Sequence, residues 1–429
     1  SFTGISATAV LRVESVPKAL AALVDKSLLL QEGGRFRLHQ SVRDLCASVT
    51  DPVLVEATRE RHAAYFLDAG EELLTSLRGP GAGRAFALLG TAEAELRGIH
   101  GMAVAQRDGD RAMRAALCLE PTLARRGDHR SLVALLELAR SAGPRPSLAA
   151  RGALAEARAH GWQFDFQPAL EAANRGLELA KSAAEPELMA EARSELAMVE
   201  VRCGQGTDAA KRYRDALAAM RDAGDRRGEG VVLLRLANLL SEQGETQAAT
   251  MMYRVALEAS RDAQDRVYEG ITLSNLGAQL LDDGRPDQAH QALYLSEEIF
   301  RELGEERYGA VSRGLIGYAV ALQGNWEQGA EAVEKAVETL QRIGERGVIV
   351  FFLGVLVAAR ARLGEGAAAR KWAAHMSGVA ASLRGTPVEH ITELRKGHLE
   401  LLDAVEAAAE GDRAEASRLI ETARQRAHA

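Results

Sequence analysis

The stretch NLGAQLLDDGRPDQA, residues 275–289, decides the fold of this chain. Its first half has the composition of a helix, and a second helical run begins after Arg285. Gly284 stands between the two runs, where helices commonly end in a left-handed residue. Glycine takes that conformation without steric strain. The stretch therefore predicts two helices joined by a tight turn.

This turn recurs along the chain every 40 residues. A small residue stands five positions after each turn glycine, and a bulky aliphatic residue stands eight positions before it. Small residues let helices approach closely where they cross, and large aliphatic residues fill the space between them. A second series of turn residues falls midway and contains Gly224, Gln264, Gly304 and Gly344. The main series is Gly204, Gly244, Gly284, Gly324 and Gly364.

The combination of a Leu-(Gly/Ala) pair with small residues at fixed offsets resembles the tetratricopeptide repeat, with each copy lengthened to 40 residues. Five regular copies run from about residue 190 to 385. An irregular copy precedes them, with Ala169 and Gly176 in phase, and another follows, with Gly411 and Ala416. The resemblance implies an all-α fold, with a superhelix over residues 146–429 and irregular copies as caps.

In such superhelices the first helix of each pair lines the concave face, which is the usual binding surface. The resemblance implies that this groove receives a protein, a peptide or a small inducer. Asn238 and Asn275 match positions that often hold peptide backbone in the family, although a solvated helical Asn is the alternative. Arg and Asn suit the role because an extended peptide presents bare C=O and N–H groups. The groove residues implied are Arg202, Arg235, Asn238, Asn275, Tyr318, Phe351 and Arg362.

The run VIVFFLGVLVAA, residues 348–359, is the most apolar part of the chain. A membrane-spanning helix needs about 20 apolar residues, so this run predicts a buried helix and no membrane span. Alternatively, Phe351 of this run forms an apolar floor of the groove.

The 429 residues carry a net charge of −7, which argues against general nucleic-acid binding. Three distant cysteines indicate reduced thiols and a cytoplasmic protein.

Residues 53–145 predict irregular bridging helices, and residues 1–52 differ again. The segment LVDKSLLLQEGGRFRLHQSVRDLC, residues 23–46, places a Gly-Gly turn between two short runs of strand formers. Helix, hairpin and helix in this order predict the end of a winged-helix domain. Arg35 and Arg37 lie on the solvated face of the hairpin and could contact DNA phosphates. The preceding helix carries little charge, so DNA binding is disfavoured.

The Phe2–Gly4 motif, LVDKSLL, FRLHQSVRDLC and RHAAYFLDAGEEL together resemble the winged-helix end of STAND-type signalling NTPases, which include the NB-ARC proteins. The resemblance implies that His39 contacts the diphosphate of ADP bound to a nucleotide-binding domain. Gln40 replaces the acidic residue that follows this histidine in the family. The alternative for His39 is a packing residue at a helix N-terminus.

No GxxxxGK[ST] motif occurs in the sequence, so an NTPase domain would have to precede Ser1. No HExxH or GxSxG motif occurs either, and we expect no enzyme activity and no cofactor. His390, Glu393 and His398 share one predicted helix, but their pattern only weakly favours a metal site.

The sequence thus predicts the ligand- or partner-sensing module of a STAND-type signalling or transcription-regulatory protein. A self-contained tetratricopeptide adaptor is the main alternative, and a DNA-binding regulator is a lesser one.

Overall fold

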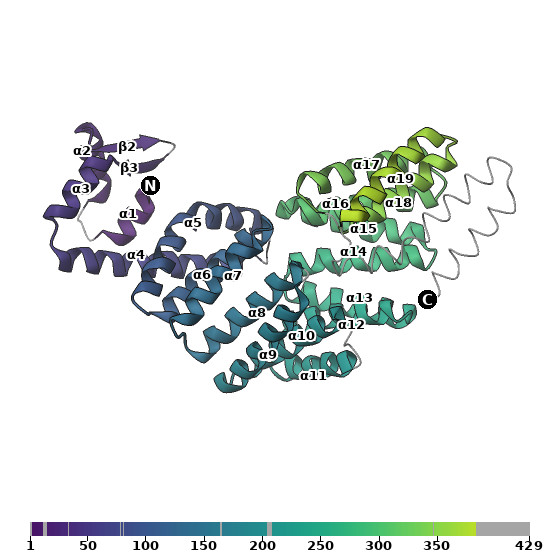
Figure 1. The fold of residues 1–429 in the computed structure, drawn as a ribbon, viewed down its shortest axis with the longest axis horizontal. Helices are drawn as coiled ribbons and strands as arrows, with labels where there is room; N and C mark the ends of the chain where they lie inside the picture. Colours follow the sequence, from purple (N-terminus) through teal and green to yellow (C-terminus); the bar gives the residue numbers. More distant parts are fainter. Residues whose placement is uncertain are drawn as a thin grey trace. The chain divides into compact units, whose positions relative to one another are not determined.

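The computed structural model describes residues 2–11, 15–32, 34–77, 79, 81–163, 165–203, 208–345 and 347–382, which form 19 helices and one small sheet (Figure 1). The chain divides into two compact units. The first contains Ser1–Ser76 and Ala85–Gly152, and the second contains Leu77–Arg84 and Ala153–Ala429. The three-part division predicted from the sequence stays a prediction.

The predicted hairpin is present in the first unit, between two helices. Its strands form an antiparallel sheet in the order β1-β3-β2, in which β1 is a short strand that the sequence analysis did not predict. β1 pairs with β3 of the hairpin, with Phe2 opposite Phe36. The elements are β1 (Phe2–Thr3), α1 (Gly4–Val10), α2 (Val16–Asp25), β2 (Leu29–Glu32), β3 (Arg35–Leu38) and α3 (Gln40–Val49).

Four longer helices continue the first unit, and acidic side chains cap the first turns of the last two. Asp108 accepts a hydrogen bond from the backbone N–H of Arg111, and Asp128 accepts one from Ser131. Such caps satisfy backbone donors that a helix leaves free in its first turn. The helices are α4 (Pro52–Ser76), α5 (Ala82–Ala105), α6 (Gly109–Arg125) and α7 (His129–Ser141), followed by α8 (Pro146–Trp162), which continues into the second unit.

The second unit is a series of helix pairs in which the predicted 40-residue period is confirmed. Gly244, Gly284, Gly324 and Gly364 all have positive φ, as expected for left-handed turn residues, and Gln264 does so midway. Gly204, Gly411 and Ala416 lie outside the described residues. The helices are α9 (Phe166–Ala183), α10 (Pro186–Arg202), α11 (Ala209–Asp222), α12 (Arg226–Glu242), α13 (Thr246–Asp262), α14 (Arg266–Asp282), α15 (Pro286–Leu303), α16 (Glu306–Leu322), α17 (Trp326–Arg342), α18 (Ile349–Arg362) and α19 (Gly366–Ser382).

Small residues bring the two helices of a pair into close contact. A Cβ atom added to Gly317 of α16 would lie 2.8 Å from the carbonyl oxygen of Gly329 in α17. That distance is shorter than real Cβ contacts, so the two backbones touch at this crossing. The apolar run at 348–359 is buried in α18, as predicted, with Phe352 and Leu353 fully excluded from solvent.

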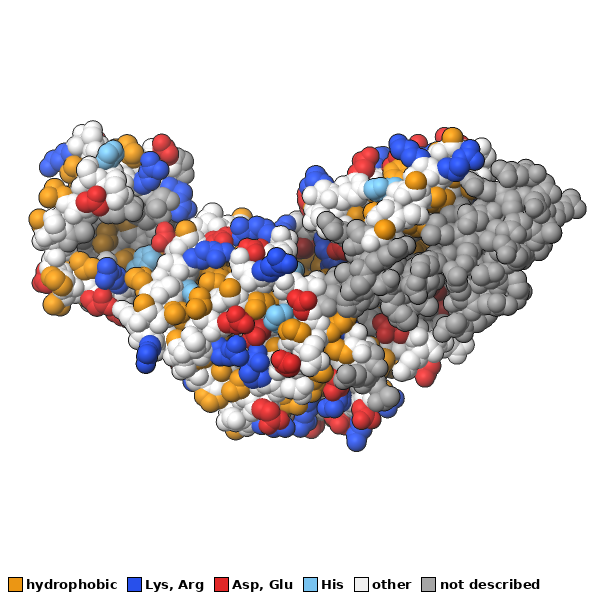
Figure 2. Space-filling view, viewed as in Figure 1, with side chains coloured by type: hydrophobic (Ala, Val, Ile, Leu, Met, Phe, Trp, Pro, Cys, Tyr) orange, Lys and Arg blue, Asp and Glu red, His pale blue; other side chains and the backbone are white. Residues whose placement is uncertain are grey.

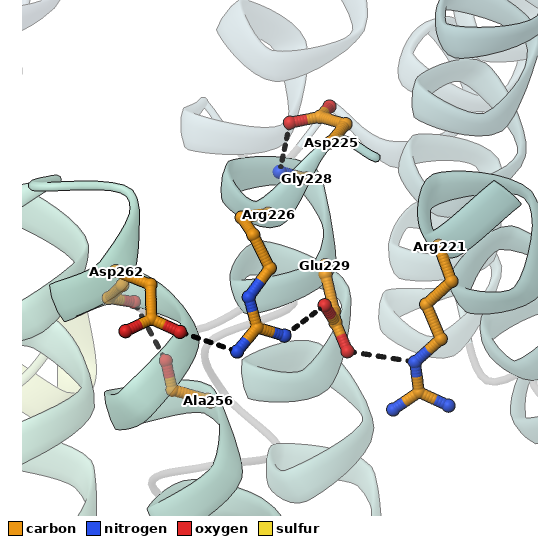
Figure 3. Close-up of polar contacts among 8 residues, drawn as sticks. Arg221, Asp225, Arg226, Gly228, Glu229, Ala256 and Asp262 are labelled. Carbon is orange, nitrogen blue, oxygen red and sulfur yellow. Dashed lines mark hydrogen bonds and ion pairs between the residues drawn. The ribbon is translucent and has the colours of Figure 1, made fainter. Parts of the chain in front are cut away.

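Ion pairs repeat with the same period, and they join the two helices of a pair as well as neighbouring pairs. Arg226 contacts both Glu229 on its own helix and Asp262 at the end of α13, while Arg221 contacts the other side of Glu229 (Figure 3). One repeat later, Arg266 makes the same contacts to Glu269 and Glu302. In the next repeat the polarity is reversed, with Glu306 on the first helix and Arg342 on the second, 3.1 Å apart.

Candidate ligand-binding face

The first helices of the regular pairs, α10, α12, α14, α16 and α18, carry all seven residues predicted for the groove. We call the surface formed by these seven side chains the groove face. It has a polar part on α10, α12 and α14 and an aromatic part on α16 and α18. The residues of the groove face are Arg202, Arg235, Asn238, Asn275, Tyr318, Phe351 and Arg362.

Asn238 and Asn275 are brought together by the packing of α12 against α14. The Oδ1 atom of Asn238 accepts a hydrogen bond of 2.9 Å from Nδ2 of Asn275 and one of 2.8 Å from the hydroxyl of Tyr253. Among the described residues, Nδ2 of Asn238 donates to no acceptor and Oδ1 of Asn275 accepts from no donor. Both side chains are half-buried. The pair therefore offers a free donor and a free acceptor in a fixed orientation.

Arg235 joins this face to α10 through two hydrogen bonds of 2.8 Å, one to the hydroxyl of Ser194 and one to Oε2 of Glu195. Burial opposes the charge on Arg235, but Glu195 together with Tyr268 and Tyr213 outweighs that effect, and the pKa of Arg235 is raised. The other carboxylate oxygen of Glu195, Oε1, has no partner among the described residues, although the side chain is only 1% exposed. A buried acceptor without a donor is costly, which marks this as an unusual position.

Arg202 is held differently, because no carboxylate of the described residues lies within ion-pair distance of it. Its guanidinium lies 5.9 Å from the ring centre of Trp162, the last residue of α8. Desolvation by the surrounding protein lowers the pKa of Arg202; the charge of Glu195 partly opposes this effect, and the neighbouring Arg235 adds to it. Arg202 is thus a cation that the protein does not fully compensate.

The aromatic part of the face is built by edge contacts. Tyr318 on α16 and Phe351 on α18 meet edge to face with their ring centres 5.6 Å apart. Phe351 is half-buried, and its neighbour Phe352 is fully buried in the core. Arg362 lies over the ring of Trp326 at 4.9 Å, a typical cation–π distance. This part offers apolar and aromatic surface in place of hydrogen-bonding groups.

The predicted residues also contact four side chains that were not predicted from the sequence: Tyr253, Glu195, Trp162 and Trp326. Tyr253 could have been found from the period, because Tyr213 stands 40 residues before it and is equally buried. Burial raises the pKa of both tyrosines, so they stay neutral hydrogen-bonding groups. Glu195 and Trp162 also follow the period, because they stand 40 residues before Arg235 and Arg202. Trp326 follows no repeated pattern, and only the three-dimensional structure places it.

His39 precedes α3 in the first unit, at the N-cap position, and its side chain is exposed. Its Nδ1 atom lies 3.0 Å from the hydroxyl of Ser41. Arg37 is exposed on the hairpin. On the face shown in Figure 2, acidic and basic side chains are interspersed over the described surface.

Among the described residues, no group of three or more His, Cys, Asp or Glu side chains is placed to hold a metal ion. The predicted residues His390, Glu393 and His398 lie outside the described part of the chain. None of the described helices combines the length and apolar character needed to cross a bilayer.

A profile of the tetratricopeptide repeat family matches residues 188–262, which correspond to α10–α13. No curated protein matches the chain by sequence. A Rap protein complexed with competence and sporulation factor has a similar structure, with 14% identity and a TM-score of 0.58, over 85% of this chain and 98% of the other. The apo quorum sensor NprR from B. thuringiensis shares 12% identity with a TM-score of 0.53, over 84% of this chain and 96% of the other.

A signal transduction ATPase with numerous domains that carries a tetratricopeptide repeat sensor, from Pyrococcus horikoshii, shares 16% identity with a TM-score of 0.50. The match covers 90% of this chain and 62% of that protein, so the chain spans less than two thirds of its length. At these identities the similarity shows the fold alone. The chain is an all-α protein with a tetratricopeptide-repeat superhelix, as the sequence predicted.

Proposed function

We propose that the repeat unit is a sensor module that binds a peptide, or an exposed segment of a partner protein, along the groove face. The observation that carries the proposal is the Asn238–Asn275 pair. Its free N–H and free C=O match the C=O and N–H of one peptide group in an extended chain. A small inducer with the same two groups is the alternative occupant.

The aromatic part of the face supports the same function. Tyr318 and Phe351 lie one and two helix pairs beyond Asn275. A side chain of a bound peptide could bury apolar surface there, while the asparagines hold its backbone. Similar structures support the proposal by analogy, since a Rap conjugation regulator of plasmid pLS20 was solved in complex with the Phr* peptide.

Selection from a library of displayed nine-residue peptides tests the proposal. We expect enriched peptides that bind the purified chain and carry an apolar residue toward one end. Tyr318→Ala should weaken their binding about tenfold, because an aromatic side chain of a binding site commonly contributes more than 1 kcal/mol. Tyr294→Ala is the matched control, because Tyr294 is an exposed aromatic residue of a second helix, α15. Failure to enrich any peptide, or equal losses in both variants, would contradict the proposal.

We further propose that this sensor serves a STAND-type signalling or transcription-regulatory protein, with residues 1–52 as a winged-helix link to a nucleotide-binding domain. His39 would then contact the nucleotide diphosphate, which agrees with its exposed position before α3. The coding region that precedes Ser1 distinguishes this context from a self-contained adaptor. A P-loop encoded there supports the signalling context, and a start codon without one supports the adaptor.

A further inference from the structure

Two contacts in the second unit join helices that are not neighbours in the series of pairs. In a stack of repeats, each repeat normally contacts only the next one. Here the guanidinium of Arg307, near the start of α16, lies 4.7 Å from the ring centre of Trp162, the last residue of α8. Seven helices, α9 to α15, separate these two residues along the chain. We call the contact between Trp162 and Arg307 the bridge.

The second contact is apolar and adjoins the bridge. Ala82, the first residue of α5, belongs to the second unit and is fully buried in a cluster with Phe300 and Leu303 of α15. Tyr308 packs against the same cluster and stacks on Phe300, with the two ring centres 5.1 Å apart. The guanidinium of Arg307 lies 5.4 Å from the ring centre of Tyr308. The bridge is therefore anchored on a buried core.

The period shows that the bridge is added to an arrangement that recurs elsewhere. Arg227 stands 80 residues before Arg307, at the same position of the repeat. Arg227 donates from Nε to Asp265 at 2.8 Å, and Arg307 donates from Nε to Glu345 at 2.6 Å. Each guanidinium also lies over a tyrosine ring, at 5.6 Å for Arg227 and 5.4 Å for Arg307. Arg307 thus has the local contacts of Arg227 and, in addition, the contact with Trp162.

The bridge spans the polar part of the groove face. The ring of Trp162 contacts Arg202 at the end of α10, at 5.9 Å, as well as Arg307 near the start of α16. These are the first and the fourth of the five first helices. Asn238 and Asn275 lie on the two helices between them, α12 and α14. The bridge therefore ties together the two helices that flank the asparagine pair.

A contact across several pairs fixes a quantity that each pair alone leaves soft. The curvature of a superhelix follows from a small rotation between successive repeats. Small changes in these rotations add up between α10 and α16 and alter the spacing of the side chains along the groove face. Because the bridge holds both ends of this stretch, it limits such changes. A ligand that contacts several first helices then binds without having to order them, and this preorganisation raises its affinity.

We propose that Trp162 and Arg307 are positioning residues for the bound peptide: their bridge holds α10–α16 at the curvature at which the groove face binds it. The inference rests on the proposed peptide-binding function and adds to it two residues outside the groove face. The bridge is closed in the same structure in which the asparagine pair offers its free donor and acceptor, so the bridged arrangement is the one that binds. Since coupling is reciprocal, a bound peptide in turn holds the bridge closed.

Calorimetry with the strongest nine-residue peptide from the selection tests this role. Arg307→Gln removes the bridge and should weaken binding about fivefold, a factor that a partly exposed cation–π contact commonly contributes. Arg227→Gln is the matched control, because it removes the same kind of ion pair and tyrosine contact. This control should leave the affinity unchanged. An unchanged affinity of Arg307→Gln, or equal losses in both variants, would overturn the positioning role while the proposed function stands.

A distance measurement tests the bridge without any peptide. Spin labels at Asp215→Cys on α11 and Lys335→Cys on α17 report the distance across the bridged stretch, after replacement of the two cysteines that are not buried. Both positions are exposed on second helices. Arg307→Gln should lengthen and broaden this distance, and the selected peptide should reverse the change, whereas Arg227→Gln should leave the distance as in the natural chain. A distance that Arg307→Gln does not alter would overturn the inference, whether or not any peptide is enriched.

Discussion

The helix pairs of the second unit and the hairpin segment at residues 2–49 are stabilised on different scales. In the pairs, buried side chains form one continuous core that runs from Ala190 to Met376. The hairpin segment has a core of four buried residues, Ala7, Val16, Leu20 and Leu29. An inner helix pair is supported by neighbours on both sides, whereas the hairpin segment meets α4 through α1, where Arg61 donates a hydrogen bond to the carbonyl oxygen of Val10.

This difference also appears at the surface. Leu45 and Val49 of α3 and Val53 and Leu54 of α4 are large apolar residues that stay more than half exposed. The helix pairs instead bury most of their large aliphatic residues against the next pair. The periodic structure should therefore tolerate the loss of one contact better than the small core of the hairpin segment.

The largest effect should follow from separating two backbones within a helix pair. Gly317→Val should reduce the free energy of unfolding by about 3 kcal/mol, because a Cβ there would lie 2.8 Å from the carbonyl oxygen of Gly329. Gly309→Ala on the same helix is the control. Its Cβ would lie 3.7 Å from Phe300, an ordinary contact, and helix propensity should favour Ala by about 1 kcal/mol. Urea unfolding measures both, and equal stabilities would show that α16 and α17 do not cross here.

A slightly smaller effect is expected from the small core of the hairpin segment. Leu29→Ala should cost about 2–3 kcal/mol, because Leu29 is one of its four buried residues. Hydrogen exchange followed by mass spectrometry should show loss of protection at β2 and β3, while α12–α16 keep theirs. If protection falls equally in both regions, the hairpin segment does not unfold separately from the helix pairs, which would contradict this comparison.

The turns of the helix pairs should respond to a change of backbone preference alone. Gly244 has a φ of +77° and nothing within 4 Å of an added Cβ, so only conformational strain acts there. Gly244→Val should cost about 1–2 kcal/mol, and Gly244→Asn should cost less because Asn tolerates the left-handed region. Thermal unfolding of both variants measures the difference. A stable Val variant would argue against the left-handed turn.

The smallest effect should come from the ion pairs within a helix pair. Arg342→Glu places a carboxylate beside Glu306 and should cost about 0.5 kcal/mol at low salt, since both side chains are more than half exposed. The double exchange Glu306→Arg/Arg342→Glu reproduces the polarity of the Arg226–Asp262 pair and should restore stability. Salt titration of the melting temperature measures this. If the double variant were as unstable as the single one, residues 306 and 342 would not form an ion pair between α16 and α17.

The same comparison explains how far the sequence could predict the molecule. A period depends on local turn geometry and on small residues at crossings, so Gly284 and its equivalents were sufficient to predict the helix pairs. β1 was missed because a two-residue strand has no pattern of its own and forms only through pairing with Phe36. Glu195 and Trp162 stand one period before Arg235 and Arg202, but the hydrogen bond and the cation–π contact that join each pair are visible only in the three-dimensional structure. The mutual hydrogen bond of Asn238 and Asn275 likewise required the three-dimensional structure.

The most direct test of the proposed groove is the affinity of a selected peptide for the double variant Asn238→Ala/Asn275→Ala, measured by calorimetry. Removing both side chains should weaken binding at least tenfold, because the peptide group loses a donor and an acceptor, each worth about 1 kcal/mol. Asn174→Ala is the control, since Asn174 is an exposed asparagine on α9 that bonds to Leu170 of its own helix. A tenfold loss confined to the double variant is the predicted result, and an unchanged affinity would contradict the role of the groove face.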